Sequence, residues 1–146
     1  MSKLGDMLKV NVADTFAFYL KTHNFHWNVE GPDFYEYHKF FDTLYTEVWE
    51  AVYAVAEHLR TLDEYVPGSF SRFSELTDIK DETTIPSGMG MIKQLLADNE
   101  IVIKNLKETH AFAEKENEPA IVNFLEERID VHSKHGWMLR ASLKGR

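Results

Sequence analysis

The stretch that separates the first two helical segments reads His26-Trp27-Asn28-Val29-Glu30-Gly31-Pro32. Glycine and proline stop a helix here, because glycine is flexible and proline lacks an amide hydrogen and clashes with the preceding turn. The segment before the stop runs from about Leu4 to Asn28, and the next from about Asp33 to Leu62. Asp33 is the predicted N-cap of that second segment, with Glu36 three residues later as in a capping box.

Two further segments with helical period run from about Ser87 to Glu114 and from about Glu118 to Leu143, with Pro119 suited to the first turn of the latter. A long connection joins the second and third segments. Within it, a short amphipathic turn is predicted, with Ser69 as its cap; its apolar residues are Phe70, Phe73 and Leu76. Four helices with one long crossover predict an all-α, ferritin-like bundle, as a single domain over residues 1–146.

Composition narrows the class of protein. The chain has 146 residues and 44% hydrophobic residues, which suits one globular domain with a sizeable core. It has no cysteine, which excludes disulfides and thiolate metal sites. No apolar stretch is long enough to span a membrane, and the first six residues lack the layout of a signal peptide. A cytoplasmic protein is therefore expected.

Charge argues against nucleic acid as a partner. The formal net charge is -8. Lys3 and Lys9 near the start are offset by Asp6, and Lys144 with Arg146 makes no polybasic tail. DNA binding is therefore not predicted, since phosphate contacts need clustered cations. An acidic surface is better suited to attracting metal cations.

The second helical segment carries two adjacent stripes, although packing inside one bundle requires only one. One stripe is an ordinary apolar face; it contains Tyr37, Phe41, Leu44, Val48, Val52, Val55, Leu59 and Leu62. The other mixes aromatic and ionisable groups; it contains His38, Asp42, Tyr45, Trp49, Tyr53 and Glu57. Such a mixture is typical of interface cores, so we expect this face to pack on another copy of the chain. The alternative is a solvated face with a few aromatics.

A di-iron site inside one bundle is not predicted. Ferritins that hold two irons within a bundle use Glu-x-x-His motifs, and none of the seven histidines here has a glutamate three residues before it. Any iron must therefore bind elsewhere.

The chain resembles the Dps-type mini-ferritins over nearly its whole length. The resemblance rests on residues 26–32, Phe34, His38, Phe41, Ala56-Glu57, the short helix of the crossover and Trp137-Met138-Leu139-Arg140-Ala141. This resemblance implies a dodecameric shell with ferroxidase centres at two-fold interfaces. One subunit supplies His26 and His38, and the other supplies the residues at positions 53 and 57, here Tyr53 and Glu57.

The resemblance also implies roles for further residues and for substrates. Asp42 matches an acid that supports the second metal position, and Trp27 lies beside the site as a sacrificial reductant. Hydrogen peroxide takes electrons from Fe²⁺, ferric mineral collects in the cavity, and hydroxyl radicals are avoided. Zinc is expected to compete with iron for these sites. Acids near the start of the last helix line pores for Fe²⁺ in this family, and Glu118 and Glu127 are the candidates here. The alternative is favourable charge near a helix N-terminus plus a solvated face.

Tyr53 departs from the family pattern, because an aspartate is expected there. Three interpretations stay open. In the first, Tyr53 is an interface aromatic and the site is weakened. In the second, its phenolate binds Fe³⁺, which can lower the pKa of a phenol. In the third, other residues compensate for the missing acid, namely Asp42, Glu50 or His23. The function predicted from the sequence is iron storage with altered ferroxidase activity. The alternatives are a metal-sequestering shell with little oxidation and, last, a DNA-compacting protein.

The remaining histidines have weaker claims to a metal. His132 and His135 are three residues apart and could together bind a metal ion, but a core or interface role is favoured. His58 and His110 are interpreted as helix-surface residues.

Overall fold

The computed structural model describes residues 3–145 and contains only helices as regular structure in that range. They are α1 (Lys3–Asn28), α2 (Phe34–Thr61), α3 (Phe70–Leu76), α4 (Gly88–Lys115) and α5 (Pro119–Leu143). The all-α prediction is confirmed, and every predicted segment lies within a few residues of a helix. Met1, Ser2 and Arg146, which contributed to the sequence arguments on the chain ends, lie outside the described residues.

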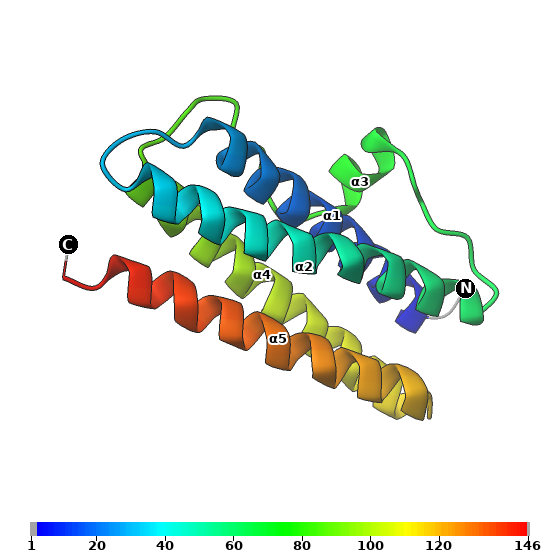
Figure 1. Cartoon of the computed structure of the whole chain (residues 1–146). Helices are drawn as coiled ribbons and strands as arrows, with labels where there is room; N and C mark the ends of the chain where they lie inside the picture. Colours follow the sequence, from blue (N-terminus) through cyan, green and yellow to red (C-terminus); the bar gives the residue numbers. More distant parts are fainter. Residues whose placement is uncertain (1–2, 146) are drawn as a thin grey trace.

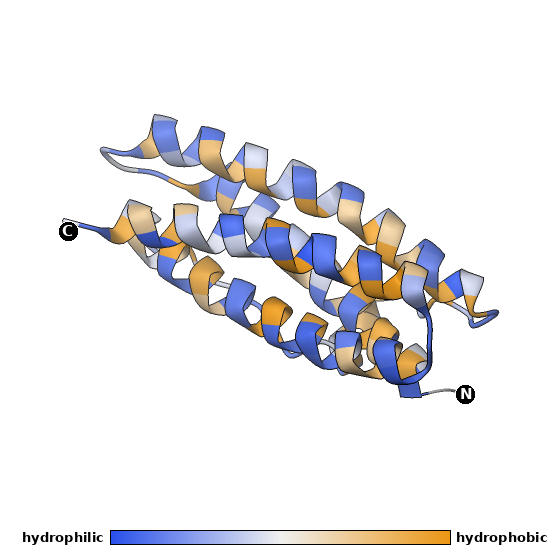
Figure 2. Cartoon of the chain, turned by 90° about the horizontal axis from the view of Figure 1, so that it is seen from below, coloured by the Kyte–Doolittle hydropathy of each residue, from blue (hydrophilic) through white to orange (hydrophobic). Residues whose placement is uncertain are grey.

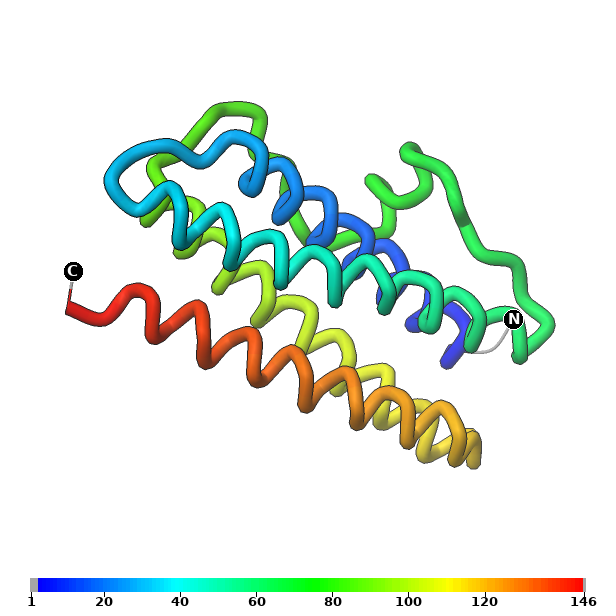
Figure 3. Tube along the Cα trace, viewed as in Figure 1, coloured from blue at the N-terminus to red at the C-terminus, as the bar shows by residue number. Residues whose placement is uncertain are grey.

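The four long helices form two antiparallel pairs, α1 with α2 and α4 with α5, stacked as two layers (Figure 1). The connection from α2 to α4 runs back along the bundle on the outside of α1, carrying α3 (Figure 3). Because of this crossover, α2 and α4 run in the same direction. This is the ferritin-like arrangement predicted from the long connection.

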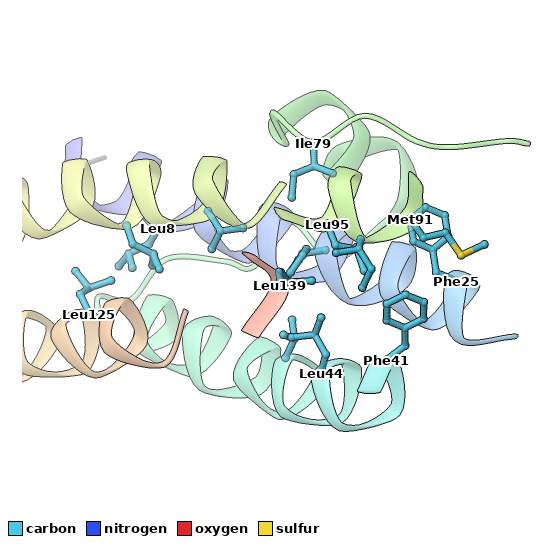
Figure 4. Close-up of a cluster of buried hydrophobic side chains, with 14 of the residues drawn as sticks. Leu8, Phe25, Phe41, Leu44, Ile79, Met91, Leu95, Leu125 and Leu139 are labelled. Atoms are coloured by element: carbon cyan, nitrogen blue, oxygen red, sulfur yellow. The ribbon is translucent and has the colours of Figure 1, made fainter. Parts of the chain in front are cut away.

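Apolar residues at helical spacing face inward from all four long helices, while polar residues cover the outside (Figure 2). Phe25, Phe41, Met91 and Leu95 fill one part of the core, where α1, α2 and α4 meet (Figure 4). Leu125 and Leu139 contribute from α5. The apolar stripe predicted on α2 is buried except at Val52 and Leu62, which are half-buried.

The helix ends follow the predicted chemistry with one correction. Ser69 Oγ accepts a hydrogen bond from the Arg72 amide, and Pro119 occupies the first turn of α5, as predicted. Asp33 does occupy the N-cap position of α2, but its side chain makes no capping hydrogen bond, so the capping-box prediction is wrong. Its backbone angles, φ −101° and ψ 19°, depart from the extended conformation that usually aims an N-cap side chain at the first turn.

The crossover is tied to the bundle by a buried carboxylate. Asp14 on α1 accepts hydrogen bonds from Thr77 Oγ1 at 2.7 Å, the Asp78 amide at 3.0 Å and Asn105 Nδ2 at 2.7 Å. Burial raises the pKa of Asp14, while these three bonds oppose that rise. The carboxylate therefore joins α1, the crossover and α4 at one point.

A polar cluster lies between α2, α4 and α5. Arg128 donates two hydrogen bonds to the Glu47 carboxylate, and His135 Nε2 lies 2.7 Å from Glu47 Oε1. His132 is fully buried; its Nε2 accepts from Arg128 and its Nδ1 donates to Asn99 Oδ1. Burial, followed by the positive charge of Arg128, lowers the pKa of His132 well below its ordinary value. The prediction of core positions for His132 and His135 is confirmed, and both ring nitrogens of His132 are engaged.

Candidate metal centre

Two histidines from neighbouring helices meet face to face at one end of the α1–α2 pair. His26 is in the last turn of α1 and His38 is in the first turns of α2. Their rings stack with centroids 3.9 Å apart and planes 15° apart. The turn between the helices allows this, since Gly31 takes a positive φ of 111°, which side-chain-bearing residues rarely adopt.

Reciprocal hydrogen bonds hold the pair. His26 Nδ1 lies 2.7 Å from the backbone oxygen of His38, and His38 Nδ1 lies 2.8 Å from the backbone oxygen of His26. A carbonyl oxygen can only accept, so both Nδ1 atoms carry the hydrogen, and in the neutral imidazole form each Nε2 atom carries the lone pair. A histidine that binds a metal through one ring nitrogen usually donates the hydrogen of the other to a carbonyl or carboxylate, which fixes the ring orientation. The pair is thus prepared to offer two neutral nitrogen ligands.

One chain does not complete a metal site. Among residues 3–145, no group of three or more histidine, aspartate and glutamate side chains is placed to hold a metal ion. Tyr53 and Glu57 share α2 with His38, but a rise of about 1.5 Å per residue puts them about 22 Å and about 28 Å further along the helix. The structure therefore brings together His26 and His38, and it does not bring Tyr53 or Glu57 to them within one subunit.

The aromatic face, formed by Trp27 of α1 with Tyr45, Trp49 and Tyr53 of α2, is largely open in the single chain. Trp27 is 61% exposed, Trp49 41% and Tyr53 64%. Large aromatics are costly to leave in water, so a face of this kind is expected to be covered by another protein surface. The prediction that this second stripe faces a copy of the chain stays a prediction.

His23 was a candidate ligand only as compensation for Tyr53, and its surroundings are now defined. Its ring lies between the Trp27 indole, at a centroid distance of 3.9 Å, and the Tyr45 phenol, at 3.8 Å. Its Nδ1 lies 2.9 Å from the Tyr19 hydroxyl. Burial, followed by the neighbouring His26, lowers the pKa of His23. Tyr19 was not predicted as part of this cluster, although its position four residues before His23 on α1 puts both side chains on one helix face.

Asp42 lies one turn after His38 on the exposed side of α2. Its carboxylate accepts a hydrogen bond from Thr46 Oγ1 at 3.2 Å and is also hydrogen-bonded to Tyr45. Burial, followed by the charge of Asp42, raises the pKa of Tyr45. Asp42 is therefore the anionic group placed next to the His26–His38 pair along the same helix face.

The family model described as a ferritin-like domain matches residues 5–145. The DNA protection during starvation protein of Helicobacter pylori is 32% identical over 142 residues, covering 97% of this chain and 99% of the relative. The chain is a Dps-type mini-ferritin. The crystal structure of a Dps protein from Bacillus brevis agrees with a TM-score of 0.93 at 29% identity, covering 99% of this chain and 100% of that one.

A second solved Dps protein connects the family to its chemistry. The Vibrio cholerae Dps structure has a TM-score of 0.94 and 27% identity, and it covers 97% of this chain and 89% of its own. It is described as a member of a broad superfamily of ferritin-like diiron-carboxylate proteins.

Among residues 3–145, no helix of this mini-ferritin is long and apolar enough to cross a membrane.

The two acids predicted to line a pore lie at the start of α5 in this Dps-type mini-ferritin. Glu118 is the N-cap residue and borders a hollow that also has Glu114, Asn117 and Glu126 on its wall. Glu127 is exposed and is not part of that wall. Glu126 instead binds His110 Nε2 at 2.8 Å. The pore assignment of Glu118 and Glu127 stays a prediction.

Proposed function

We propose that this mini-ferritin forms a dodecameric shell that binds Fe²⁺ at sites shared by two subunits, oxidises it with hydrogen peroxide and stores it as ferric mineral. Protection against oxidative stress follows, because Fe²⁺ and peroxide are consumed together. The observation that carries the proposal is the His26–His38 pair, whose Nδ1 atoms are bound to backbone carbonyls while both Nε2 lone pairs remain for a metal.

Antiparallel packing of two copies of α2 would complete the site. His38 near the start of α2 in one subunit would then lie opposite Tyr53 and Glu57 near its end in the other. The midpoint between residues 38 and 57 falls within the aromatic face, between Tyr45 and Trp49. Imidazole with carboxylate suits Fe²⁺, so the proposed ligands are His26, His38 and Glu57, with Asp42 supporting a second ion. Glu118 and Glu127 are proposed to guide Fe²⁺ inward.

Tyr53 favours one alternative function. A phenol brings no negative charge at neutral pH unless a metal ionises it, so the proposed site has one anionic ligand fewer than an aspartate would supply. A shell that sequesters metal, including Zn²⁺, with little oxidation is the second candidate. DNA compaction ranks last at a net charge of -8. The cytoplasmic location predicted from the sequence stays a prediction.

The test is anaerobic stopped-flow oxidation of about two Fe²⁺ per expected site, started with hydrogen peroxide and followed by ferric absorbance. A fast phase well above a protein-free control, absent in His26→Ala and kept in His58→Ala, is expected for a ferroxidase. His58 is the matched control, since its Nδ1 also binds a backbone carbonyl but on a different part of α2. A rate equal to the protein-free control would leave only the sequestering shell.

A further inference from the structure

A buried arginine inside the bundle is surrounded by side chains of the kinds that bind metals. Arg128 is 7% exposed and donates two hydrogen bonds to the Glu47 carboxylate. Its Nη2 also lies 2.8 Å from His132 Nε2. His135 Nε2 reaches the same carboxylate and lies 2.7 Å from Glu47 Oε1. The guanidinium therefore occupies the place where a carboxylate and two imidazoles come together.

The hydrogen bonds hold His132 in the form that binds a metal. A guanidinium can only donate, so His132 Nε2 accepts from Arg128 and carries a lone pair. Its Nδ1 donates to Asn99 Oδ1 at 2.9 Å, and Asn99 Nδ2 donates to the His132 backbone oxygen at 2.8 Å. A metal-binding histidine usually has its other nitrogen held in this way. His132 would therefore need no change of protonation to bind a metal in place of the arginine.

The cluster also has the composition of a metal-ligand set. Two histidines and one glutamate, with a water in the fourth position, bind Zn²⁺ in several enzymes. The His132 and His135 rings have centroids 5.4 Å apart, near enough for both to reach one ion. His135 Nε2 now donates to Glu47, so it would bind a metal after that hydrogen had moved to its other ring nitrogen or to solvent.

Arginine is suited to keeping such a site closed. Its guanidinium stays protonated at physiological pH, and it donates to the same acceptor atoms that a metal would bind. With Arg128 in place, no group of three or more histidine, aspartate and glutamate side chains among residues 3–145 is placed to hold a metal ion. A buried ion pair is often no more stabilising than well-packed apolar residues, so stability alone does not account for an arginine here.

We propose that the Arg128 guanidinium occupies a latent metal site inside the bundle and thereby excludes divalent metal ions from it. The ligands of that site are Glu47, His132 and His135, and Asn99 orients His132. The excluded ions are those that imidazole and carboxylate bind together, such as Fe²⁺, Zn²⁺ and Co²⁺. Arg128 is thus a residue that determines where in the subunit a metal can bind.

The experiment removes the arginine and detects the opened site with Co²⁺. The background protein carries His26→Ala and His38→Ala, so that the proposed interface site is absent. Adding Arg128→Ala should allow one further Co²⁺ to bind per subunit, measured by equilibrium dialysis, with the intense visible bands of four-coordinate Co²⁺. Its affinity should be at least about tenfold above that of any site in the background protein. All other histidines are common to both proteins, so their contribution cancels.

Further variants assign the bands to this cluster. Glu47→Gln, added to Arg128→Ala, removes a ligand and should abolish the bands. Asn99→Ala, added instead, should keep the bands but weaken Co²⁺ binding by about tenfold, because His132 loses the partner that orients it. Glu126→Gln changes an exposed acid elsewhere on α5 and is the matched control, which should bind Co²⁺ as the Arg128→Ala protein does.

Arg128→Ala leaves a buried carboxylate unpaired, so thermal unfolding is measured as well. Zn²⁺ should raise the unfolding temperature of this variant more than that of the background protein, because the ion binds only the folded site. Arg128→Gln, which keeps a neutral donor for His132, is the second variant if Arg128→Ala does not fold. Four-coordinate bands absent from both variants, or equally strong in the background protein, overturn the proposal. Because His26 and His38 are absent throughout, this result is independent of the stopped-flow test of ferroxidase activity.

Discussion

The imidazole of His26 stacks on that of His38 at a centroid distance of 3.9 Å, and each ring's Nδ1 donates to the other residue's carbonyl oxygen. His26 lies in the last turn of α1 and His38 in the first turns of α2, so the same two hydrogen bonds orient the proposed ligands and tie the helices together. The relationship is reciprocal, and a change at either residue therefore acts on both.

Replacing His38 should weaken metal binding beyond the loss of one ligand. In His38→Ala the His26 ring also loses its stacking partner, so we expect Fe²⁺ or Zn²⁺ affinity to fall at least about tenfold. Anaerobic isothermal titration calorimetry measures this directly. His58→Ala, on the same helix, should bind as wild type does. Unchanged affinity in His38→Ala would show that this pair is not the metal site.

Restoring an acid at position 53 should accelerate iron oxidation. Tyr53→Asp adds the anionic ligand that the resemblance to the family leads us to expect, and we predict a rise of about tenfold in the initial rate with peroxide. Tyr53→Phe separates the interpretations of the phenol. A rate unchanged in Tyr53→Phe identifies an interface aromatic, whereas a fall, with loss of any visible phenolate-to-iron band, identifies a ligand. If Tyr53→Asp is no faster than wild type, Tyr53 does not impair the site.

A charge placed in the aromatic face should disrupt the shell. Trp49→Glu puts a carboxylate near the proposed two-fold axis, where it meets its own copy without a partner charge. Sedimentation velocity at micromolar concentration should show a shift from a large assembly to small species. Tyr65→Glu, an exposed aromatic outside this face, is the control and should leave the assembly intact. Wild-type sedimentation of Trp49→Glu would place the subunit interface elsewhere.

Stability in acid should depend on Glu47. Burial raises its pKa, but hydrogen bonds from His135 and Arg128 outweigh that effect and hold the pKa at about 2, against an ordinary value of 4.5. The ionised form therefore stabilises the fold fully above pH 4.5, and this contribution is lost as the pH falls towards 2.

Glu47→Gln should cost about 2 kcal/mol at neutral pH, less than for a fully buried pair because a third of the side chain is exposed. Thermal unfolding of both proteins between pH 7 and strongly acidic pH measures the difference, which should shrink below pH 4.5. Glu126→Gln, which removes an exposed partner of His110, should have little effect. A difference that stays constant with pH would mean that Glu47 does not act through its charge.

The sequence by itself determined the helices and the family. Gly31-Pro32, Ser69 and Pro119 mark helix boundaries through local backbone chemistry, so their effects could be read without knowing the neighbours. The apolar period gave the buried face of α2, and the length of the crossover predicted the ferritin-like order of helices. His26 and His38 were predicted as ligands from the resemblance, with their spacing as support, and that role stays a prediction.

Only the tertiary structure decided how side chains distant in sequence meet. Glu47 and Arg128 are on different helices, and their pairing depends on how α2 and α5 lie across the core. The Nδ1 hydrogen of His26 is held by the backbone carbonyl of His38, twelve residues away. The stack of Trp27, His23 and Tyr45 depends on the relative rotation of α1 and α2. Periodicity reports which face of a helix is buried, but the rotation and depth of two packed helices are set by side-chain interlocking along their whole length.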